Sequence, residues 1–355
     1  MNKASASFAL RFALRTLRFA TCSLQFAYAL AIVAWFFGRL AWGDQHWALA
    51  ALNSFPAWLF LPAPVMPGVA ALTRRRIAWA AALVPVVLWL ALFGWRFLPR
   101  APRAEGGDGT LRVMAFNILG TNQDVDGIVA AIQAAEPDLI ALSELGPATD
   151  VALARRLAAD YPYRTLHLLT GASFGAGIYS RWPLDDLGSL QTGLGLRSAA
   201  ADAHTPDGMV HFVALHPQAT MVSGRSAREI AANLQVMFRG REAQLVAICR
   251  YLDRWGDRPV ILAGDFNMTE FSDAYRCVSQ RLSDGYRTAG YGYGYTWPDR
   301  LPAPWPWNRF GWLPLLTRID YVFHSRHWVA VDAQVLKMAT GSDHRPVVVT
   351  LRRIA

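Results

Sequence analysis

The sequence predicts a mixed α/β domain preceded by about three membrane-spanning helices. Three long runs without a charged residue lie within the first 98 residues and predict the helices. From Leu111 onward, short apolar runs of strand length alternate with amphipathic runs of helix length. We therefore expect a membrane anchor over residues 1–98, a Gly- and Pro-rich linker over 99–110 and one folded domain over 111–355.

The formal charge of +9 belongs to the anchor. Residues 1–98 contain 9 basic and 1 acidic residue, whereas residues 99–355 contain 26 basic and 25 acidic residues. A nearly neutral domain does not predict the basic surface of a nucleic-acid-binding protein. The cysteines Cys22, Cys249 and Cys277 are too few for a disulfide framework or a zinc site. We expect the last two to be buried thiols, with a disulfide between them as the alternative if the domain is exported.

The three apolar runs of the anchor cover residues 20–38, 47–72 and 77–95. The first is long enough to cross ~30 Å of hydrocarbon as a helix. The second contains four prolines, which must kink or break any helix there. A cleaved signal peptide is the alternative for the first run, but no small-residue cleavage site follows it.

The distribution of basic residues predicts the orientation of the anchor. Basic residues precede the first run and form the triplet Arg74–Arg76 between the second and third, whereas the loop at 43–46 has none. The positive-inside rule then places the N-terminus in the cytoplasm and residues 99–355 outside it. If residues 47–72 were re-entrant, the folded domain would instead be cytoplasmic and the Arg triplet would face outward.

The folded domain contains several elements that the sequence pattern predicts directly. Helices are expected at 124–136 and 226–255. Strands are expected at 111–117, 138–144, 175–180, 196–203, 209–215, 259–264, 317–323 and 345–351.

Polar residues follow these apolar strands at their ends. A carboxylate directly after an apolar run is costly unless it is paired or binds a metal ion. Asp265 and Asn267 are two residues apart, so in an extended chain their side chains point to the same side. Taken alone, Asn117 is better explained as a strand end and His216 as a structural histidine, and the others could be turn residues or ion pairs. Together they predict one shared site: Asn117, Glu144, His216, Asp265, Asn267, Asp320, Asp343 and His344.

The motifs that contain these residues resemble the endonuclease/exonuclease/phosphatase superfamily. In chain order they are AFNIL, LSEL, GIYSRWPL, VALH, GDFN, RIDYVF and GSDHRPV, and the resemblance covers residues 111–353. It implies a four-layer α/β/β/α sandwich of two packed sheets with helices on both outer faces. It also implies a hydrolase that cleaves phosphoester or phosphoanhydride bonds by in-line attack of water.

The resemblance assigns a metal site to three of the residues. Glu144 would be the main ligand of a divalent ion, with Asn117 and Asp343 beside it. Hard cations prefer such oxygen ligands, which indicates Mg²⁺, with Mn²⁺ as the alternative.

The remaining residues would act on the substrate. Asp265 would deprotonate the attacking water and Asn267 would hold a phosphate oxygen. His344, supported by Asp320 or Asp343, and His216 would stabilise the developing charge. Arg181 and Arg197 occupy positions near those that support the phosphate in this family.

The sequence departs from two branches of the family. Deoxyribonuclease-type members place an acidic residue before the SR-x-P element, where this chain has GASFGAG, so His216 lacks that partner. The Cys-Asp-Arg signature of inositol 5-phosphatases is replaced by LTRID, which argues against a phosphoinositide substrate.

The membrane-anchored architecture and the TWP…RIDYVF stretch resemble bacterial teicoplanin-resistance (VanJ-type) membrane proteins. That resemblance implies a multi-pass protein of the cytoplasmic (inner) membrane with its catalytic domain on the extracytoplasmic, periplasmic side. The implied partners are the lipid bilayer and a phosphorylated lipid such as undecaprenyl pyrophosphate. The alternatives are a membrane-tethered nuclease acting on DNA or RNA and a non-catalytic binding protein on the same fold.

The aromatic segment 291–316, which includes Trp297, bears on the substrate. It is expected to lie at the level of the lipid headgroups and to bind substrate, since Trp and Tyr favour that zone. A Pro-rich loop packed on its own domain and a stacking surface for nucleobases are the alternatives.

Overall fold

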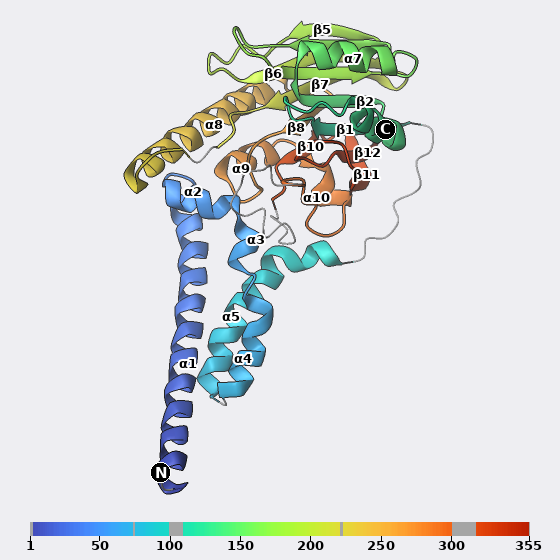
Figure 1. Ribbon diagram of the computed structural model, residues 1–355. Helices are drawn as coiled ribbons and strands as arrows, with labels where there is room; N and C mark the ends of the chain where they lie inside the picture. The colour runs from blue at the N-terminus through green and yellow to red at the C-terminus, as the bar shows by residue number, and fades with distance from the viewer. Residues whose placement is uncertain (1–2, 74, 99–108, 221–222, 300–316, 355) are drawn as a thin grey trace. The chain divides into compact units, whose positions relative to one another are not determined.

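The computed structural model describes residues 3–73, 75–98, 109–220, 223–299 and 317–354 (Figure 1). The chain divides into two compact units, Met1–Phe97 and Leu98–Ala355. Helices joined by short turns make up the described part of the first unit, and the second contains all the described strands.

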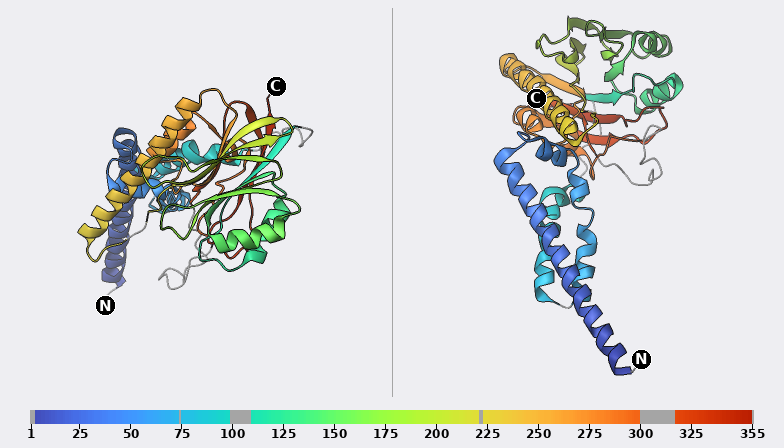
Figure 2. Two further views of the ribbon diagram at one scale, coloured as in Figure 1. Left: turned by 90° about the horizontal axis from the view of Figure 1, so that it is seen from above. Right: turned by 60° about the vertical axis from the view of Figure 1, so that its left-hand side comes forward.

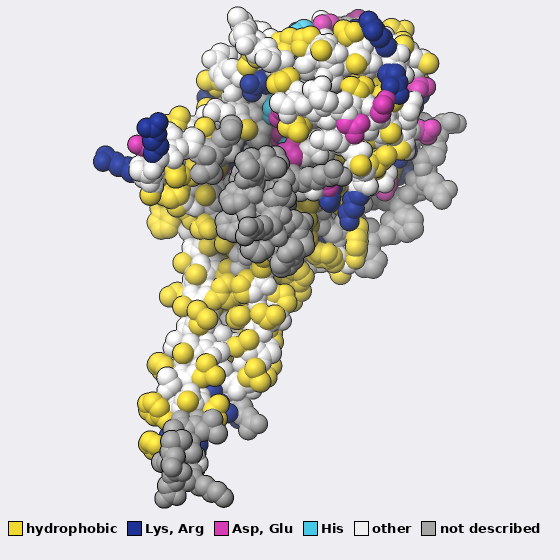
Figure 3. All heavy atoms as spheres, in the orientation of Figure 1, with side chains coloured by type: hydrophobic (Ala, Val, Ile, Leu, Met, Phe, Trp, Pro, Cys, Tyr) yellow, Lys and Arg dark blue, Asp and Glu magenta, His cyan; other side chains and the backbone are white. Residues whose placement is uncertain are grey.

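The helical unit contains three stretches that are long and apolar enough to cross a membrane. They are Arg11–Trp42, Pro56–Thr73 and Arg76–Phe97. Many of its large apolar side chains are exposed, and hydrophobic side chains are spread along the face that Figure 3 shows, with few charged ones among them. Exposure of so much apolar surface to water is unfavourable, so this surface fits a lipid environment.

Prolines break the second apolar run, as predicted from the sequence. The segment consists of short helices rather than one continuous span, and the candidate span begins at Pro56 instead of residue 47. Polar side chains brace the helices: Trp35 donates to Asn53 at 3.1 Å and Gln25 donates to the carbonyl of Met66 at 3.0 Å. The helices of this unit are α1 (Lys3–Trp42), α2 (Trp47–Ser54), α3 (Pro56–Leu59), η1 (Ala63–Val65), α4 (Met66–Thr73), α5 (Arg76–Phe93) and η2 (Gly94–Phe97).

The second unit confirms the predicted mixed α/β class with two packed sheets. The first sheet has the spatial order β11 (Trp328–Val335), β12 (Val347–Arg353), β1 (Thr110–Asn117), β2 (Leu139–Leu145), β4 (Gly175–Ser180) and β3 (Tyr163–His167). The second has the order β5 (Leu184–Gly188), β6 (Arg197–Thr205), β7 (Gly208–His216), β8 (Val260–Asp265), β10 (Asp320–His324) and β9 (Ser283–Asp284).

Alternating side chains of the strands build three apolar layers. In β1, Val113 and Ala115 face the core between the sheets, whereas Met114 and Phe116 face the helices on the outer side. The helices are α6 (Val125–Ala135) and α7 (Pro147–Leu157) on the first sheet, α8 (Ala227–Trp255) and α9 (Asp273–Ser279) on the second, and the short α10 (Gly285–Ala289). Helices α7 and α8 lie on opposite sides of the strands (Figure 2), which completes the four-layer sandwich.

Two of the cysteines follow the alternative expectation. Cys249 of α8 and Cys277 of α9 form a disulfide, with their Cα atoms 6.3 Å apart, rather than two buried thiols. That separation is within the normal range for a disulfide. Spacing along the chain could not reveal the pairing because it depends on how α9 folds back against α8.

Candidate active site at the strand ends

Strand direction gathers the polar residues. Strands β1 and β2 are parallel neighbours, as are β7 and β8, so the carboxyl ends of each pair lie at the same edge of their sheet. Asn117, Glu144, His216 and Asp265 occupy these ends. Strand β10 runs antiparallel to β8, and its first residue, Asp320, lies directly opposite Asp265.

A bulge in β2 redirects Glu144. The pairing of β2 with β4 shifts register between Ser143 and Leu145, and Glu144 has a φ of 59°. Such bulges re-aim a side chain, and a positive φ in a non-glycine residue stores strain that is common at functional sites. The Glu144 carboxylate accepts the backbone N–H of Gly120 at 2.9 Å. A Cβ at Gly120 would lie 2.6 Å from the ring of Phe174, so glycine is required there.

Asn117 connects the two sheets. Its side-chain nitrogen donates to Glu144 Oε1 and to Asp265 Oδ2, each at 3.0 Å. Its side-chain oxygen accepts the backbone N–H of Leu119 at 3.0 Å. Because this amide is buried and held on both ends, it fixes the distance between the two carboxylates.

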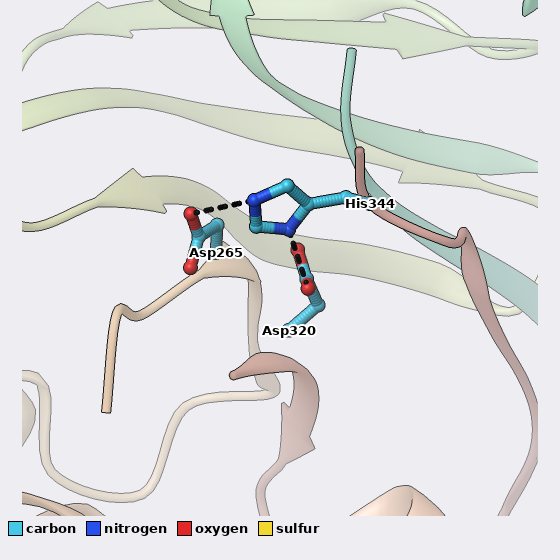
Figure 4. Close-up of side chains that lie close together, drawn as sticks. All are labelled: Asp265, Asp320 and His344. Carbon is cyan, nitrogen blue, oxygen red and sulfur yellow. Dashed lines mark hydrogen bonds and ion pairs between the residues drawn. The ribbon is translucent and has the colours of Figure 1, made fainter. Parts of the chain in front are cut away.

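His344 lies between Asp265 and Asp320 (Figure 4). Its Nδ1 is 2.9 Å from Asp320 Oδ2, and its Nε2 is 3.8 Å from Asp265 Oδ2. Burial alone would lower the pKa of His344, but the two carboxylates outweigh it and raise the pKa to about 10. His344 is therefore a cation at neutral pH, and Asp320 rather than Asp343 is its supporting carboxylate.

Asp265 is fully buried beside another carboxylate. Burial, together with the charge of Asp320, raises the pKa of Asp265 to about 7. Its Oδ1 accepts the backbone N–H of Asn267 at 2.8 Å. A carboxyl group with a pKa near neutral pH is suited to exchange a proton with a reacting water.

Asn267 completes the turn after β8. It has a φ of 52°, and its side-chain amide donates to the carbonyl of Pro217 at 3.1 Å. Arg241 of α8 donates to the backbone carbonyl of Asn267 and to Thr220 Oγ1, the latter at 3.0 Å. The guanidinium thus supports a strained turn that orients both Asp265 and Asn267.

His216 lies beside the cluster without a hydrogen bond of its own. Its Nε2 is 3.7 Å from Glu144 Oε1 and 3.6 Å from Asp265 Oδ2. Neither ring nitrogen has a hydrogen-bond partner among the described residues, in keeping with the missing acidic partner. Burial lowers the pKa of His216 to about 4, so its ring is neutral at neutral pH.

Asp343 is held by an indole. Trp297 Nε1 donates to Asp343 Oδ2 at 3.0 Å. The other oxygen, Oδ1, is buried, and no hydrogen bond to it occurs within the described part of the chain. The ring of Trp297 lies 6.4 Å from that of His344.

The donor chemistry of this edge fits a divalent cation. Within the described ranges, one group of His, Cys, Asp and Glu side chains is tight enough to hold a metal ion, namely Asp265, Asp320 and His344, with ligand atoms within 4.8 Å of one another. A protonated His344 is a poor ligand, which leaves oxygen donors. Burial alone would raise the pKa of Glu144, but the charge that His216 carries when protonated, the Gly120 N–H and the Asn117 amide lower it.

The two arginines predicted near the phosphate differ. Arg197 begins β6 directly opposite His216, and its charge contributes to the lowered pKa of that histidine. Arg181 does not lie with the residues gathered around Glu144. It follows Ser180 at the end of β4 that is remote from Glu144, and it donates to the carbonyl of Pro137 at 3.1 Å. Because β4 runs antiparallel to β2, the SR-x-P element lies at the opposite edge of the sheet.

Several supporting residues have no sequence signal of their own. Ser342 Oγ donates to the Asn117 carbonyl at 2.7 Å and accepts the His344 N–H at 3.0 Å. Thr296 Oγ1 accepts the Asp320 N–H at 3.2 Å. In the sequence, they are marked only by their position inside or next to the GSDHRPV and TWP motifs. Of the aromatic segment, residues 300–316 lie outside the described residues.

Comparison with known proteins gives one family match. A model of the endonuclease/exonuclease/phosphatase family matches residues 114–344. No curated protein sequence matches the chain.

Solved structures share the fold. An endonuclease/exonuclease/phosphatase from Beutenbergia cavernae is 24% identical, with 69% of this chain and 72% of that chain covered and a TM-score of 0.50. Truncated Caenorhabditis elegans TDP2 is 16% identical, with coverage of 68% and 98% and a TM-score of 0.51. A Bacteroides thetaiotaomicron mannosyl-6-phosphatase is 19% identical, with coverage of 68% and 99% and a TM-score of 0.50.

Proposed function

This chain belongs to the endonuclease/exonuclease/phosphatase family, and from that premise we propose that it is a membrane-anchored, metal-dependent phosphohydrolase. One observation carries the proposal. Asn117, Asp265, Asp320 and His344 form a continuous buried network beside Glu144, in a chain with three helical stretches long and apolar enough to cross a membrane.

Two carboxylates would hold the metal ion. Glu144 and Asp343 would supply oxygen donors, which suits Mg²⁺, with Mn²⁺ as the alternative. Asn117, which the sequence also assigned to the metal, donates its amide N–H to Glu144 and would orient that carboxylate. Asp343 Oδ1 supports this assignment, because it is buried and accepts no hydrogen bond from the described residues. Burying a carboxylate oxygen in this way is costly unless a cation or a hydrogen-bond donor binds it. A bound divalent ion supplies Lewis-acid stabilisation of the phosphoryl oxygens.

Protein side chains would accept the proton of the attacking water and stabilise the negative charge on the phosphoryl oxygens. Asp265 accepts the proton of the attacking water as the new P–O bond forms opposite the breaking one. His344, fixed by Asp320, places its positive charge against the phosphoryl oxygens. Neutral His216 and the Asn267 amide offer hydrogen bonds to the same oxygens. No covalent enzyme intermediate is needed.

A lipid-linked pyrophosphate such as undecaprenyl pyrophosphate is the proposed substrate. The fold alone does not select it, because this fold hosts many substrates. Residues 99–355 are nearly neutral, and basic and acidic side chains are interspersed over the visible face of the second unit (Figure 3). The anchor keeps the enzyme at the bilayer. These features support the grouping with teicoplanin-resistance (VanJ-type) membrane proteins.

An extracytoplasmic position of the α/β unit is part of the proposal. The charge asymmetry around the apolar runs supports it. The Cys249–Cys277 disulfide supports it independently, because disulfides persist in oxidising compartments and are rare in the cytosol.

The test is phosphate release from undecaprenyl pyrophosphate by the full-length protein in detergent with Mg²⁺. His344→Ala controls for a contaminating phosphatase, and EDTA tests the metal requirement. Release that needs both Mg²⁺ and His344 is expected. Cleavage of DNA or RNA far faster than of any lipid phosphate would instead assign the tethered nuclease.

A further inference from the structure

We propose that Trp297 is a positioning residue for the metal site, acting through the indole N–H that it donates to Asp343. The inference rests on the proposed metal-dependent function and extends it. It assigns to Trp297 a role that the sequence did not suggest, since the aromatic ring alone predicted a contact with substrate or membrane.

The hydrogen bond from Trp297 engages one oxygen of Asp343 and leaves the other without a hydrogen bond from the described residues. Oδ2 accepts the indole N–H at 3.0 Å. Oδ1 is buried, and the described residues offer it no hydrogen bond. One directional donor fixes the orientation of the carboxylate, so the free oxygen is presented in a defined direction. A hard cation is the partner that such an oxygen fits.

Trp297 is itself held rigidly. Its backbone N–H donates to the Thr317 carbonyl at 3.0 Å, and the Thr317 N–H returns a bond to the Trp297 carbonyl at 3.2 Å. Thr317 Oγ1 donates to that same carbonyl at 2.8 Å. An indole on this backbone can therefore impose an orientation on Asp343.

The residues next to Trp297 in the chain contact two segments that carry site residues. The Asp299 N–H donates to the Asp343 carbonyl at 2.7 Å, and the Asp299 carboxylate pairs with Arg345 at 2.6 Å. On the other side, Thr296 Oγ1 accepts the Asp320 N–H. Residues 296–299 thus connect the segment that carries Asp343 and His344 to the strand that carries Asp320.

The N–H and the ring of Trp297 make different predictions. If the ring of Trp297 only made an apolar contact with the substrate, phenylalanine would replace it without loss. A positioning role requires the N–H, which phenylalanine lacks. Partners in the second shell of a metal site typically contribute about 10–100-fold to metal affinity.

The experiment measures Mn²⁺ binding to the full-length protein in detergent by electron paramagnetic resonance, without substrate. We expect Trp297→Phe to weaken Mn²⁺ binding about 10-fold or more. Trp255→Phe, an indole on α8 that packs against His211, is the matched control and should leave the affinity unchanged. In an Asp343→Asn background, Trp297→Phe should add little further loss, because the two residues act as one unit.

The outcomes separate the inference from the proposed function. Unchanged Mn²⁺ affinity in folded Trp297→Phe, with a raised KM, would overturn the positioning role and leave a substrate wall. Absence of Mn²⁺ binding by the wild-type protein would overturn the proposed metal-dependent function itself. Trp297→Tyr, which also lacks a donor at the indole position, repeats the test if the phenylalanine variant does not fold.

Discussion

At the scale of single residues, the site combines groups whose burial opposes their charge. Asp265 and Asp320 share one buried cation, His344, and both sit nearly or wholly out of contact with solvent. Burying charges costs free energy even when they are paired, so this arrangement contributes little to stability. Groups of this kind are typical of active sites.

Asp265→Asn should abolish the proton transfer while keeping the shape of the side chain. The amide oxygen can still accept the Asn267 N–H, so the turn after β8 is preserved. We expect kcat to fall about 10²–10⁴-fold with little change in KM. Steady-state hydrolysis of the lipid pyrophosphate measures this. Asp257→Asn, at an exposed carboxylate paired with Arg326, is the control. A kcat within a few-fold of wild type would remove Asp265 from the mechanism.

Asp284 should make the stability of the protein depend on pH. It is buried and pairs with Arg318 at 2.6 and 3.0 Å and with Tyr275 at 2.9 Å. Burial alone would raise its pKa, but Arg318 lowers it below the usual 3.8. The carboxylate therefore stabilises the fold above about pH 4, and this contribution is lost as the pH falls through the lowered pKa.

Asp284→Asn should reduce the free energy of unfolding at pH 7 by about 3–5 kcal/mol, because it leaves the Arg318 charge buried without its main partner. The loss of stability on acidification should also become shallower in this variant. Thermal unfolding followed by near-ultraviolet circular dichroism from pH 7 to pH 3 tests both statements. Parallel pH profiles of the variant and the wild-type protein would refute the assignment to Asp284.

At the scale of elements, the close approach of two parallel strands sets the spacing of the site. Gly264 of β8 has a φ of 138°, and a Cβ there would lie 2.1 Å from the carbonyl oxygen of Leu215 in β7. These residues directly precede Asp265 and His216. Any side chain at position 264 must push the two strand ends apart.

Gly264→Ala should therefore impair both stability and catalysis. We expect a loss of more than about 1 kcal/mol in the free energy of unfolding, together with a fall in kcat. Gly193→Ala is a matched control, because its φ is also positive (69°) but nothing lies within 4 Å of the added Cβ. An equal effect of the two substitutions would show that backbone conformation matters here and the clash does not.

The elements differ in how far the sequence predicted them. Buried strands such as β1, β7 and β8 were predicted nearly to the residue, because they are continuous apolar runs. Strands β3, β5, β9 and β11 were missed. The sequence of β5, LDDLG, is polar and largely exposed, so it lacks the pattern of a buried strand.

The site shows the same division. The residues at strand ends were predicted as one set, because strand ends of parallel neighbours meet at one edge. The bulge at Glu144, the bond from Trp297 to Asp343 and the remote position of Arg181 were not. They depend on the register of β2 with β4 and on contacts between distant segments, which no local pattern encodes.

At the scale of the whole molecule, the chain joins an apolar helical unit with most of the net charge to a nearly neutral α/β unit. Nucleases that track phosphates rely on a basic surface, which this distribution does not provide. An enzyme that meets its substrate in the bilayer needs no such surface, because the anchor supplies the local concentration.

The disulfide offers a test of which side of the membrane the α/β unit occupies. If the unit is extracytoplasmic, Cys249 and Cys277 should be oxidised in protein taken directly from membranes. A maleimide-polyethylene glycol reagent added after denaturation should then label one cysteine, Cys22, before reduction and three after it. Cys249→Ser provides the control, with two labelled cysteines in both conditions.

Labelling of three cysteines without reduction would place the α/β unit in a reducing compartment. The second apolar run would then be re-entrant, and Arg74–Arg76 would face away from the cytoplasm against the positive-inside rule. A substrate presented on the outer face of the membrane would then be out of reach of the active site. The labelling experiment that determines the topology therefore also tests whether this protein can be an outward-facing lipid pyrophosphatase.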